Sequence, residues 1–184
     1  MGRSSNIGAA RSRELPHSDI RATATRVIGI SKIESSAWSH GGEYVVQPSI
    51  VVEFTNQATK GGPQTEPTVA ALLTYQDPKR EILQIPGGWT DSPTAVAEFK
   101  IGESHTLLLG SVQDGHFVAV EFAPATADGE HEDHLQMRHA LPDFHHGLVC
   151  VSLTDVRNQQ LLYDSYFEIG VNPLRISQNI PRHP

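Results

Sequence analysis

The chain has 184 residues, of which 38% are hydrophobic, 19% charged and 7% aromatic, and it carries a formal net charge of −7. This length suits a single domain with a substantial buried core. The composition excludes a disordered polyelectrolyte, and no apolar run approaches the roughly 20 residues that a membrane-spanning helix needs.

The charge is unevenly distributed along the chain. Residues 1–26 contain five arginines against one glutamate and one aspartate, a net charge of +3, so the remainder carries −10. The acidic remainder disfavours nucleic acid and anionic lipid as partners and leaves only the basic N-terminal residues to contact them. We interpret residues 1–20 as a disordered basic tail. No apolar segment follows Arg3, so we expect no secretory signal and a cytoplasmic location.

Short apolar segments that end at turn residues follow one another from about residue 21 to residue 171. In Ser49–Thr55, the apolar residues Ile50, Val52 and Phe54 alternate with Val51 and with polar residues. Because successive side chains on a strand point to opposite faces, this period of two predicts strands with one buried face. In chain order the expected strands are Arg21–Ile33, Tyr44–Thr55, Thr68–Gln76, Glu81–Ile85, Thr94–Ile101, Ser104–Leu109, His116–Ala123, Leu148–Thr154 and Leu161–Gly170.

Turn-forming residues separate these segments. Residues 56–67 form a polar loop, and Asp114–Gly115 is a tight-turn signal. Pro86-Gly87-Gly88-Trp89 is interpreted as a sharp bend, and we expect Trp89, like Trp38, to cap the core. The prolines of residues 172–184 indicate a C-terminal tail.

Strands at this spacing, without helical patterns between most of them, predict an all-β, antiparallel β-sandwich that spans residues 21–171. The pattern resembles immunoglobulin-like and fibronectin type III-like sandwiches, although a single cysteine leaves no Cys…Trp…Cys framework. The resemblance is carried by three alternating sets: Ile50/Val52/Phe54, Val69/Ala71/Leu73/Tyr75 and Val149/Val151/Leu153. It implies an adhesive, scaffolding or accessory module.

The connection over residues 124–146 is the candidate for a chemical site, since loops of this length are uncommon in compact domains. It contains five of the ten histidines and five carboxylates. Helix formers predict a short helix over Gly129–Leu141, which would place His131 and His134 on one face. Imidazoles beside carboxylates suit zinc, copper or nickel, so His131, His134 and His139 are the candidate ligands. A solvated polar loop is the simpler interpretation, and a pH-responsive contact is a third.

We expect a non-catalytic binding, scaffold or accessory module that engages a protein partner through its loops or an exposed strand edge. The apolar hairpin Leu148–Gly170 is the expected edge, and a structural role in a larger assembly, such as a viral or phage particle, belongs to the same class. No cofactor is expected, and Cys150 is interpreted as a small strand residue rather than a nucleophile. The alternative is a metal-binding protein or metal-dependent hydrolase that uses the His131–His146 loop.

Overall fold

The computed structural model describes residues 16–30, 47–91, 95–122 and 136–179. Within them the chain forms twelve β-strands, which pair antiparallel. The strands are β1 (Ile20–Ile30), β2 (Gln47–Asn56), β3 (Thr68–Gln76), β4 (Glu81–Pro86), β5 (Gly88–Trp89), β6 (Val96–Glu98), β7 (Ser104–Gln113), β8 (His116–Phe122), β9 (Gln136–Leu141), β10 (His146–Asp155), β11 (Gln160–Val171) and β12 (Leu174–Asn179).

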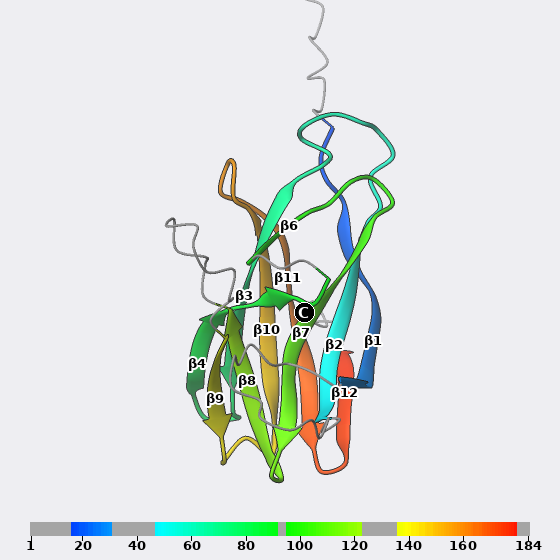
Figure 1. The fold of residues 1–184 in the computed structure, drawn as a ribbon. Coiled ribbons are helices and arrows are strands. Elements are labelled where there is room, and N and C mark those ends of the chain that lie inside the picture. Colours follow the sequence, from blue (N-terminus) through cyan, green and yellow to red (C-terminus); the bar gives the residue numbers. More distant parts are fainter. Residues whose placement is uncertain (1–15, 31–46, 92–94, 123–135, 180–184) are drawn as a thin grey trace, which may run out of the picture.

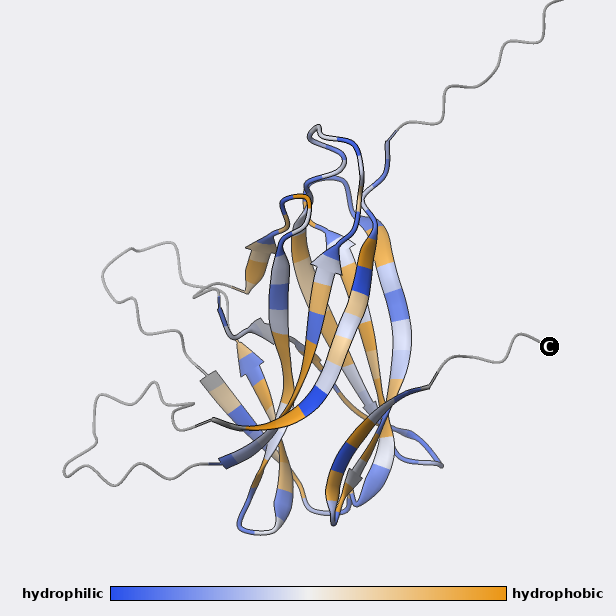
Figure 2. Ribbon diagram, turned by 90° about the vertical axis from the view of Figure 1, so that its right-hand side faces the viewer, coloured by the Kyte–Doolittle hydropathy of each residue, from blue (hydrophilic) through white to orange (hydrophobic). Residues whose placement is uncertain are grey.

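The strands form two sheets that pack face to face (Figure 1). Sheet A has the order β1-β2-β7-β8-β9, with β5 paired to β7. Sheet B has the order β12-β11-β10-β3-β4, with β6 paired to β3. The hydrophobic core fills the space between the sheets, and hydrophobic and hydrophilic residues alternate along many strands (Figure 2). The all-β, two-sheet architecture confirms the fold class predicted from the alternation.

Each of the nine expected strands overlaps an observed strand, and the expected Thr68–Gln76 coincides with β3. The expected inner face of β2 is also confirmed, because Ile50, Val52 and Phe54 are fully buried in the core. The period of two therefore identified both the strands and the sides that meet between the sheets.

The expectation that β2 has only one buried face is wrong. Val51 lies on the opposite face from Ile50 and is nevertheless fully buried. It packs with Leu108 and Val120 in a second apolar cluster, on the side of sheet A that faces away from sheet B. Strands buried on both faces have uninterrupted apolar runs, as in residues 50–52 and 107–109, instead of alternation.

The chain crosses from sheet B to sheet A between β4 and β5. The amide N–H of Gly87 donates to the carbonyl oxygen of Ala71 on β3 (2.9 Å), and two residues later Trp89 is paired with β7. A Cβ at Gly88 would lie 1.9 Å from the ring of Phe122, so a side chain there requires the ring to move. The two glycines therefore let the backbone pass between the layers.

Trp89 fills the centre of the core at this crossing. Its side chain is 1% exposed and lies edge-on to the rings of Phe99 and Phe54, with ring centroids 5.2 and 6.1 Å away. Its Nε1–H donates to the carbonyl oxygen of Val69 on β3 (3.3 Å), so the polar N–H group of the indole has a hydrogen-bond partner inside the core. Trp89 thus packs in the core, whereas Trp38 lies outside the described residues.

The prediction of a short helix over Gly129–Leu141 is wrong for Gln136–Leu141, the part of that range that the structure describes. Gln136–Leu141 form β9, which pairs with β8 along its whole length, whereas residues 123–135 lie outside the described part of the chain. Leu141 is buried in the core opposite Phe117. Backbone pairing with β8 and burial of Leu141 outweigh the helix propensity of residues such as Met137.

The prediction that residues 172–184 form a C-terminal tail is wrong for the residues that form β12. Leu174–Asn179 form β12 at the edge of sheet B, and Leu174 and Ile176 pack against the core. Pro173 lies in the turn between β11 and β12, where it interrupts no strand. At the other end β1 begins at Ile20, which is buried in the core and belongs to the expected N-terminal tail.

A buried hydroxyl joins the two sheets. The β2–β7 register shifts between Ile50 and Val51, which leaves Leu109 as the extra residue of a β-bulge. The Tyr75 hydroxyl of β3 donates to the carbonyl oxygen of Leu109 at 2.6 Å. Complete burial raises the pKa of Tyr75 well above its usual range, so this hydroxyl keeps its proton and acts as a donor.

Tyr75→Phe keeps the ring and removes the hydroxyl. We expect the free energy of unfolding, measured by urea denaturation, to fall by about 1–3 kcal/mol, because the buried carbonyl of Leu109 loses its donor. Tyr166→Phe is the control: its side chain is 36% exposed on the side of sheet B that faces away from sheet A, and we expect a loss below about 0.5 kcal/mol. Equal losses in the two variants would contradict the role of Tyr75.

Candidate functional site

The structure describes one of the three candidate metal ligands. His139 lies on β9, and its Nε2 is 2.7 Å from Oε2 of Glu121 on the neighbouring strand β8. His131 and His134 lie outside the described residues. Among the residues that the structure does describe, no group of three or more His, Cys, Asp and Glu side chains is placed to hold a metal ion. The metal hypothesis stays a prediction.

That hypothesis predicts about one equivalent of zinc, copper or nickel per purified chain after dialysis against a weak chelator. The metal is expected to be lost in the double variant His131→Ala/His134→Ala and retained in the control His17→Ala/His116→Ala. Elemental mass spectrometry measures the metal content of each. A wild-type chain that retains no metal refutes the hypothesis.

The expectation that the hairpin Leu148–Gly170 is an edge of its sheet is wrong for β10 and for the second half of β11, and it holds for Gln160–Ser165, which pair with no described strand on the side away from β10. β10 pairs with β11 on one side and with β3 on the other, and β11 in turn pairs with β12. β12 pairs only with Tyr166–Val171, so among the described strands the first half of β11 is paired on one side alone. The hairpin also contributes a surface, because alternate residues of β10 and β11 point away from sheet A. Together with β3 they form what we call the outer face of sheet B.

Apolar side chains are exposed on this outer face. Leu161 and Tyr166 of β11 and Leu72 of β3 are 57%, 36% and 40% exposed. Leu148 lies half-buried on β10, between the two strands. The solvent face of an antiparallel sheet is ordinarily polar. Exposed Leu and Tyr side chains on two of its three central strands, with the half-buried Leu148 on the third, are a feature of surfaces that bind other molecules.

The polar side chains among them bind one another. Oδ1 of Asp164 accepts hydrogen bonds from the Ser152 hydroxyl (2.8 Å) and the Cys150 thiol (3.2 Å). On the other side of the face, Nε2 of Gln84 donates to Oγ1 of Thr74 (3.0 Å). These groups already hold one another in place. The free-energy cost of ordering them when a partner binds is therefore smaller.

Cys150 is a neutral thiol within this network. Burial, together with the hydrogen bond and the charge of Asp164, raises the pKa of the Cys150 thiol to about 11. Val149, Val151 and Leu153 occupy the opposite, buried face of β10, as the alternation predicts. A thiol with this pKa is almost fully protonated near neutral pH, so Cys150 is a weak nucleophile.

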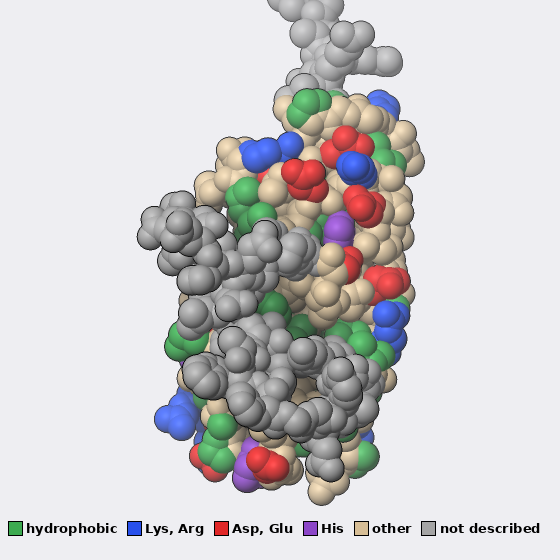
Figure 3. All heavy atoms as spheres, viewed as in Figure 1, with side chains coloured by type: hydrophobic (Ala, Val, Ile, Leu, Met, Phe, Trp, Pro, Cys, Tyr) green, Lys and Arg blue, Asp and Glu red, His purple; other side chains and the backbone are tan. Residues whose placement is uncertain are grey.

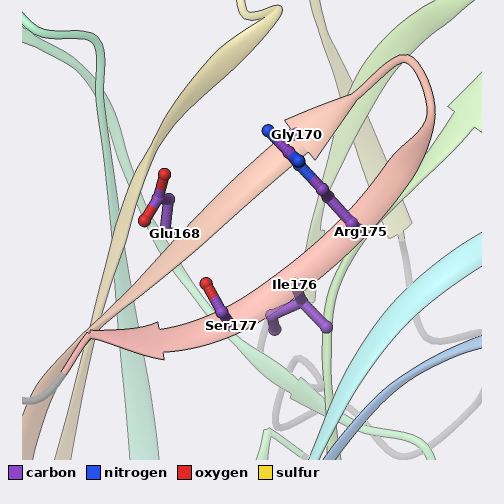
Figure 4. Close-up of a pocket in the computed structure, with 5 residues that line it drawn as sticks. All are labelled: Glu168, Gly170, Arg175, Ile176 and Ser177. Atoms are coloured by element: carbon purple, nitrogen blue, oxygen red, sulfur yellow. The ribbon is translucent and has the colours of Figure 1, made fainter.

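A shallow hollow of about 290 Å³ borders one end of the outer face, on the β11–β12 hairpin (Figure 4). The side chain of Arg175 lies across Gly170, where a Cβ would come within 2.7 Å of its Nε. Oε1 of Glu168 is 2.6 Å from Nε2 of His146 on β10. These side chains give the outer face a charged border. The residues that line the hollow are Glu168, Gly170, Arg175, Ile176 and Ser177.

The loops at one end of the sandwich are held by internal hydrogen bonds. Nδ2 of the buried Asn56 donates to the carbonyl oxygens of Thr65 (2.6 Å) and Phe99 (3.0 Å). Nη2 of Arg157 donates to the carbonyl oxygen of Pro63 (2.7 Å). These polar groups fix the shape of the loops after β2, β6 and β10, so the loops form a rigid end to the sandwich.

The alternation of apolar residues along the chain does not reveal the outer face of sheet B. One sign of it is present in β3. Val69, Ala71 and Leu73 share the buried face of this strand, and Leu72 is an apolar residue on the opposite face, where a polar residue is expected. A leucine on a solvent face is common in single instances and carries no meaning alone. Only the strand order, which places β11 and β10 beside β3, brings Leu72 onto one surface with Tyr166 and Leu161.

Comparisons of the chain with protein-family models, with curated proteins and with solved structures found no match. No helix in the part of the chain that the structure describes is long and apolar enough to cross a membrane. Function is therefore inferred from the geometry and chemistry of the surface.

Asp164→Asn removes the carboxylate that raises the pKa of the Cys150 thiol. We expect the pKa to fall and alkylation by iodoacetamide at about pH 8 to accelerate, because more thiolate is present. The alkylation rate measured against pH gives both quantities. Glu168→Gln, the same change of acid to amide on the same strand and face, is the control and should leave the rate unaltered. An unchanged profile in Asp164→Asn would rule out the thiol–carboxylate contact.

Proposed function

We propose that the protein is a non-catalytic binding or accessory module, an immunoglobulin-like β-sandwich that engages a protein partner through the outer face of sheet B. One observation carries the proposal: Leu72, Leu161 and Tyr166 are exposed on a face whose polar side chains are hydrogen-bonded to one another. By the register, Ser152 and Asp164 lie between the apolar side chains, so exposed apolar groups and preordered polar groups are interspersed, as on the mixed contact surface of a non-obligate protein interface.

The charges on this face define the chemistry of the partner. Asp164 and Glu168 lie on it, and the chain beyond residue 26 carries a net charge of −10. We expect the partner to present an apolar centre flanked by lysine or arginine side chains that face these two carboxylates. A subunit of a larger assembly would use the same contact. Nucleic acid does not fit, because its phosphates would face acidic groups.

A charge placed at the centre of the face tests the proposal. We expect Leu72→Arg to lower the recovery of a specific protein from lysate of the source cells by about tenfold or more, because the arginine enters an apolar contact and faces basic side chains. Met137→Arg is the matched control, since Met137 is similarly exposed but lies on β9 of sheet A. Quantitative mass spectrometry compares the proteins recovered by the tagged wild type and the two variants.

A protein recovered by the wild type and by Met137→Arg, but not by Leu72→Arg, is then purified. Titration calorimetry is expected to show direct binding that weakens in Asp164→Lys and at high salt. If the proteins recovered by Leu72→Arg and Met137→Arg are the same, the outer face of sheet B is not the binding surface and the proposal is wrong.

A further inference from the structure

His105 of β7 connects segments of the chain that belong to different sheets. Its Nδ1 is 2.9 Å from Oδ2 of Asp91, which follows β5, and its Nε2 is 2.9 Å from the backbone carbonyl oxygen of Glu98 on β6. β5 and β7 belong to sheet A, whereas β6 is paired with β3 of sheet B. We call these three residues the His105 link, because they join the two layers near the start of β7.

The imidazole ring lies against the aromatic part of the core. Its centroid is 4.6 Å from the ring of Phe99 and 6.2 Å from that of Trp89, and both contacts are edge-on. The side chain is only 13% exposed. Packing and two hydrogen bonds therefore hold the ring in one orientation.

The pair of His105 and Asp91 is not arranged for catalysis. In a catalytic triad an aspartate holds Nδ1 of the histidine while Nε2 faces the nucleophile. Here Nε2 is bonded to the backbone carbonyl of Glu98, so it is not available to a substrate. The contacts of the ring are therefore structural.

Both atoms that the ring contacts are hydrogen-bond acceptors. The carbonyl oxygen of Glu98 carries no proton, and neither does the ionised carboxylate of Asp91. A neutral imidazole has one N–H and one bare nitrogen, so one of the two contacts would bring two lone pairs together. An imidazolium donates from both nitrogens and satisfies both contacts. The geometry of the link therefore fits the charged form of the ring.

The charged groups that face the ring favour the same form. Asp91 contacts Nδ1, and Oε2 of Glu103, the residue before β7, is 3.8 Å from Nε2. Glu98 contributes its carbonyl oxygen, and its side chain is exposed. Phe54, which stands opposite His105 on β2, carries no charge. Figure 3 shows a histidine close to several acidic side chains in the upper half of the molecule. Carboxylates at these distances stabilise a positive charge on the ring.

We propose that the His105 link is a proton-dependent device, which fastens β6 and the residues after β5 to β7 while the ring is charged. Histidine changes its charge between about pH 5 and pH 8, where aspartate and glutamate stay ionised. The folded state uses the bound proton in both contacts, so the link is complete at the acidic end of this range and weakens as the pH rises. The inference concerns local stability and does not rest on the proposed function.

Amide hydrogen exchange, followed by NMR, measures the opening of the link. The N–H of Thr90 donates to the carbonyl oxygen of Thr106 (2.8 Å), and that of Phe99 donates to the carbonyl oxygen of Pro67 (2.9 Å), so both amides report on the joined segments. After correction for the intrinsic exchange rate, we expect their protection to fall by about tenfold or more between about pH 5.5 and about pH 8. Protection of Val151, in the centre of sheet B, should change less.

Asp91→Asn is the variant that separates the proton from the contacts. An amide at position 91 can donate to a bare Nδ1 while Nε2–H donates to Glu98, so a neutral ring satisfies both partners. We therefore expect the protection of the two reporter amides to become independent of pH over this range. The nitrogen chemical shifts of the wild-type His105 ring should show two N–H groups at about pH 5.5 and one at the alkaline end.

His146→Gln is the control for the other histidines. His146 is also paired with a carboxylate, Glu168, but the pair is exposed and lies on β10 and β11. This change should leave the pH response of the two amides unaltered. A wild-type response that is absent, that is equally large at Val151, or that persists in Asp91→Asn would overturn the proposal. A wild-type ring with a single N–H at about pH 5.5 would also overturn it.

Discussion

The passage of the chain between the two sheets at Gly87–Trp89 is the constraint on which the architecture depends. β4 belongs to sheet B and β5 to sheet A, so the backbone must cross the core within a few residues. A Cβ at Gly87 would lie 3.1 Å from side-chain atoms of Ala71, Leu73 and Leu107, which come from both sheets. The glycines let the crossing strand approach both layers, and Trp89 then fills the space beside it. The position of Phe122 over Gly88 and the packing of Phe54 and Phe99 around Trp89 follow from this crossing.

The two sheets differ in how their outer faces meet the surroundings. β2, β7 and β8 of sheet A carry apolar residues on both faces, and water is excluded from both. β3, β10 and β11 of sheet B bury one face and expose leucine and tyrosine side chains on the other. A rigid core with one closed side and one open apolar side is a suitable scaffold for a binding module, because the surface is ordered before the partner arrives.

The sequence predicted the strands and their inner faces, because burial between two sheets imposes a period of two. Thr68–Gln76 coincides with β3 for this reason. The pattern failed where another constraint decided the structure. Gln136–Leu141 contain good helix formers, yet pairing with β8 makes them a strand. Pro173 suggested the end of the fold, yet it lies in a turn that leads into β12. The outer face of sheet B was missed because alternation shows which residues share a face of one strand but not which strands are neighbours.

Hydroxyl-radical footprinting with mass spectrometry tests the difference between the two outer faces most directly, since it reports the solvent exposure of individual side chains in the unmodified protein. We expect rapid oxidation of Leu72, Leu161 and Tyr166 and slow oxidation of Val51, Leu108 and Val120, at rates similar to the core residues Leu73 and Leu107. Comparable oxidation of the two outer faces, or protection of Leu72, Leu161 and Tyr166, would contradict the difference between the faces.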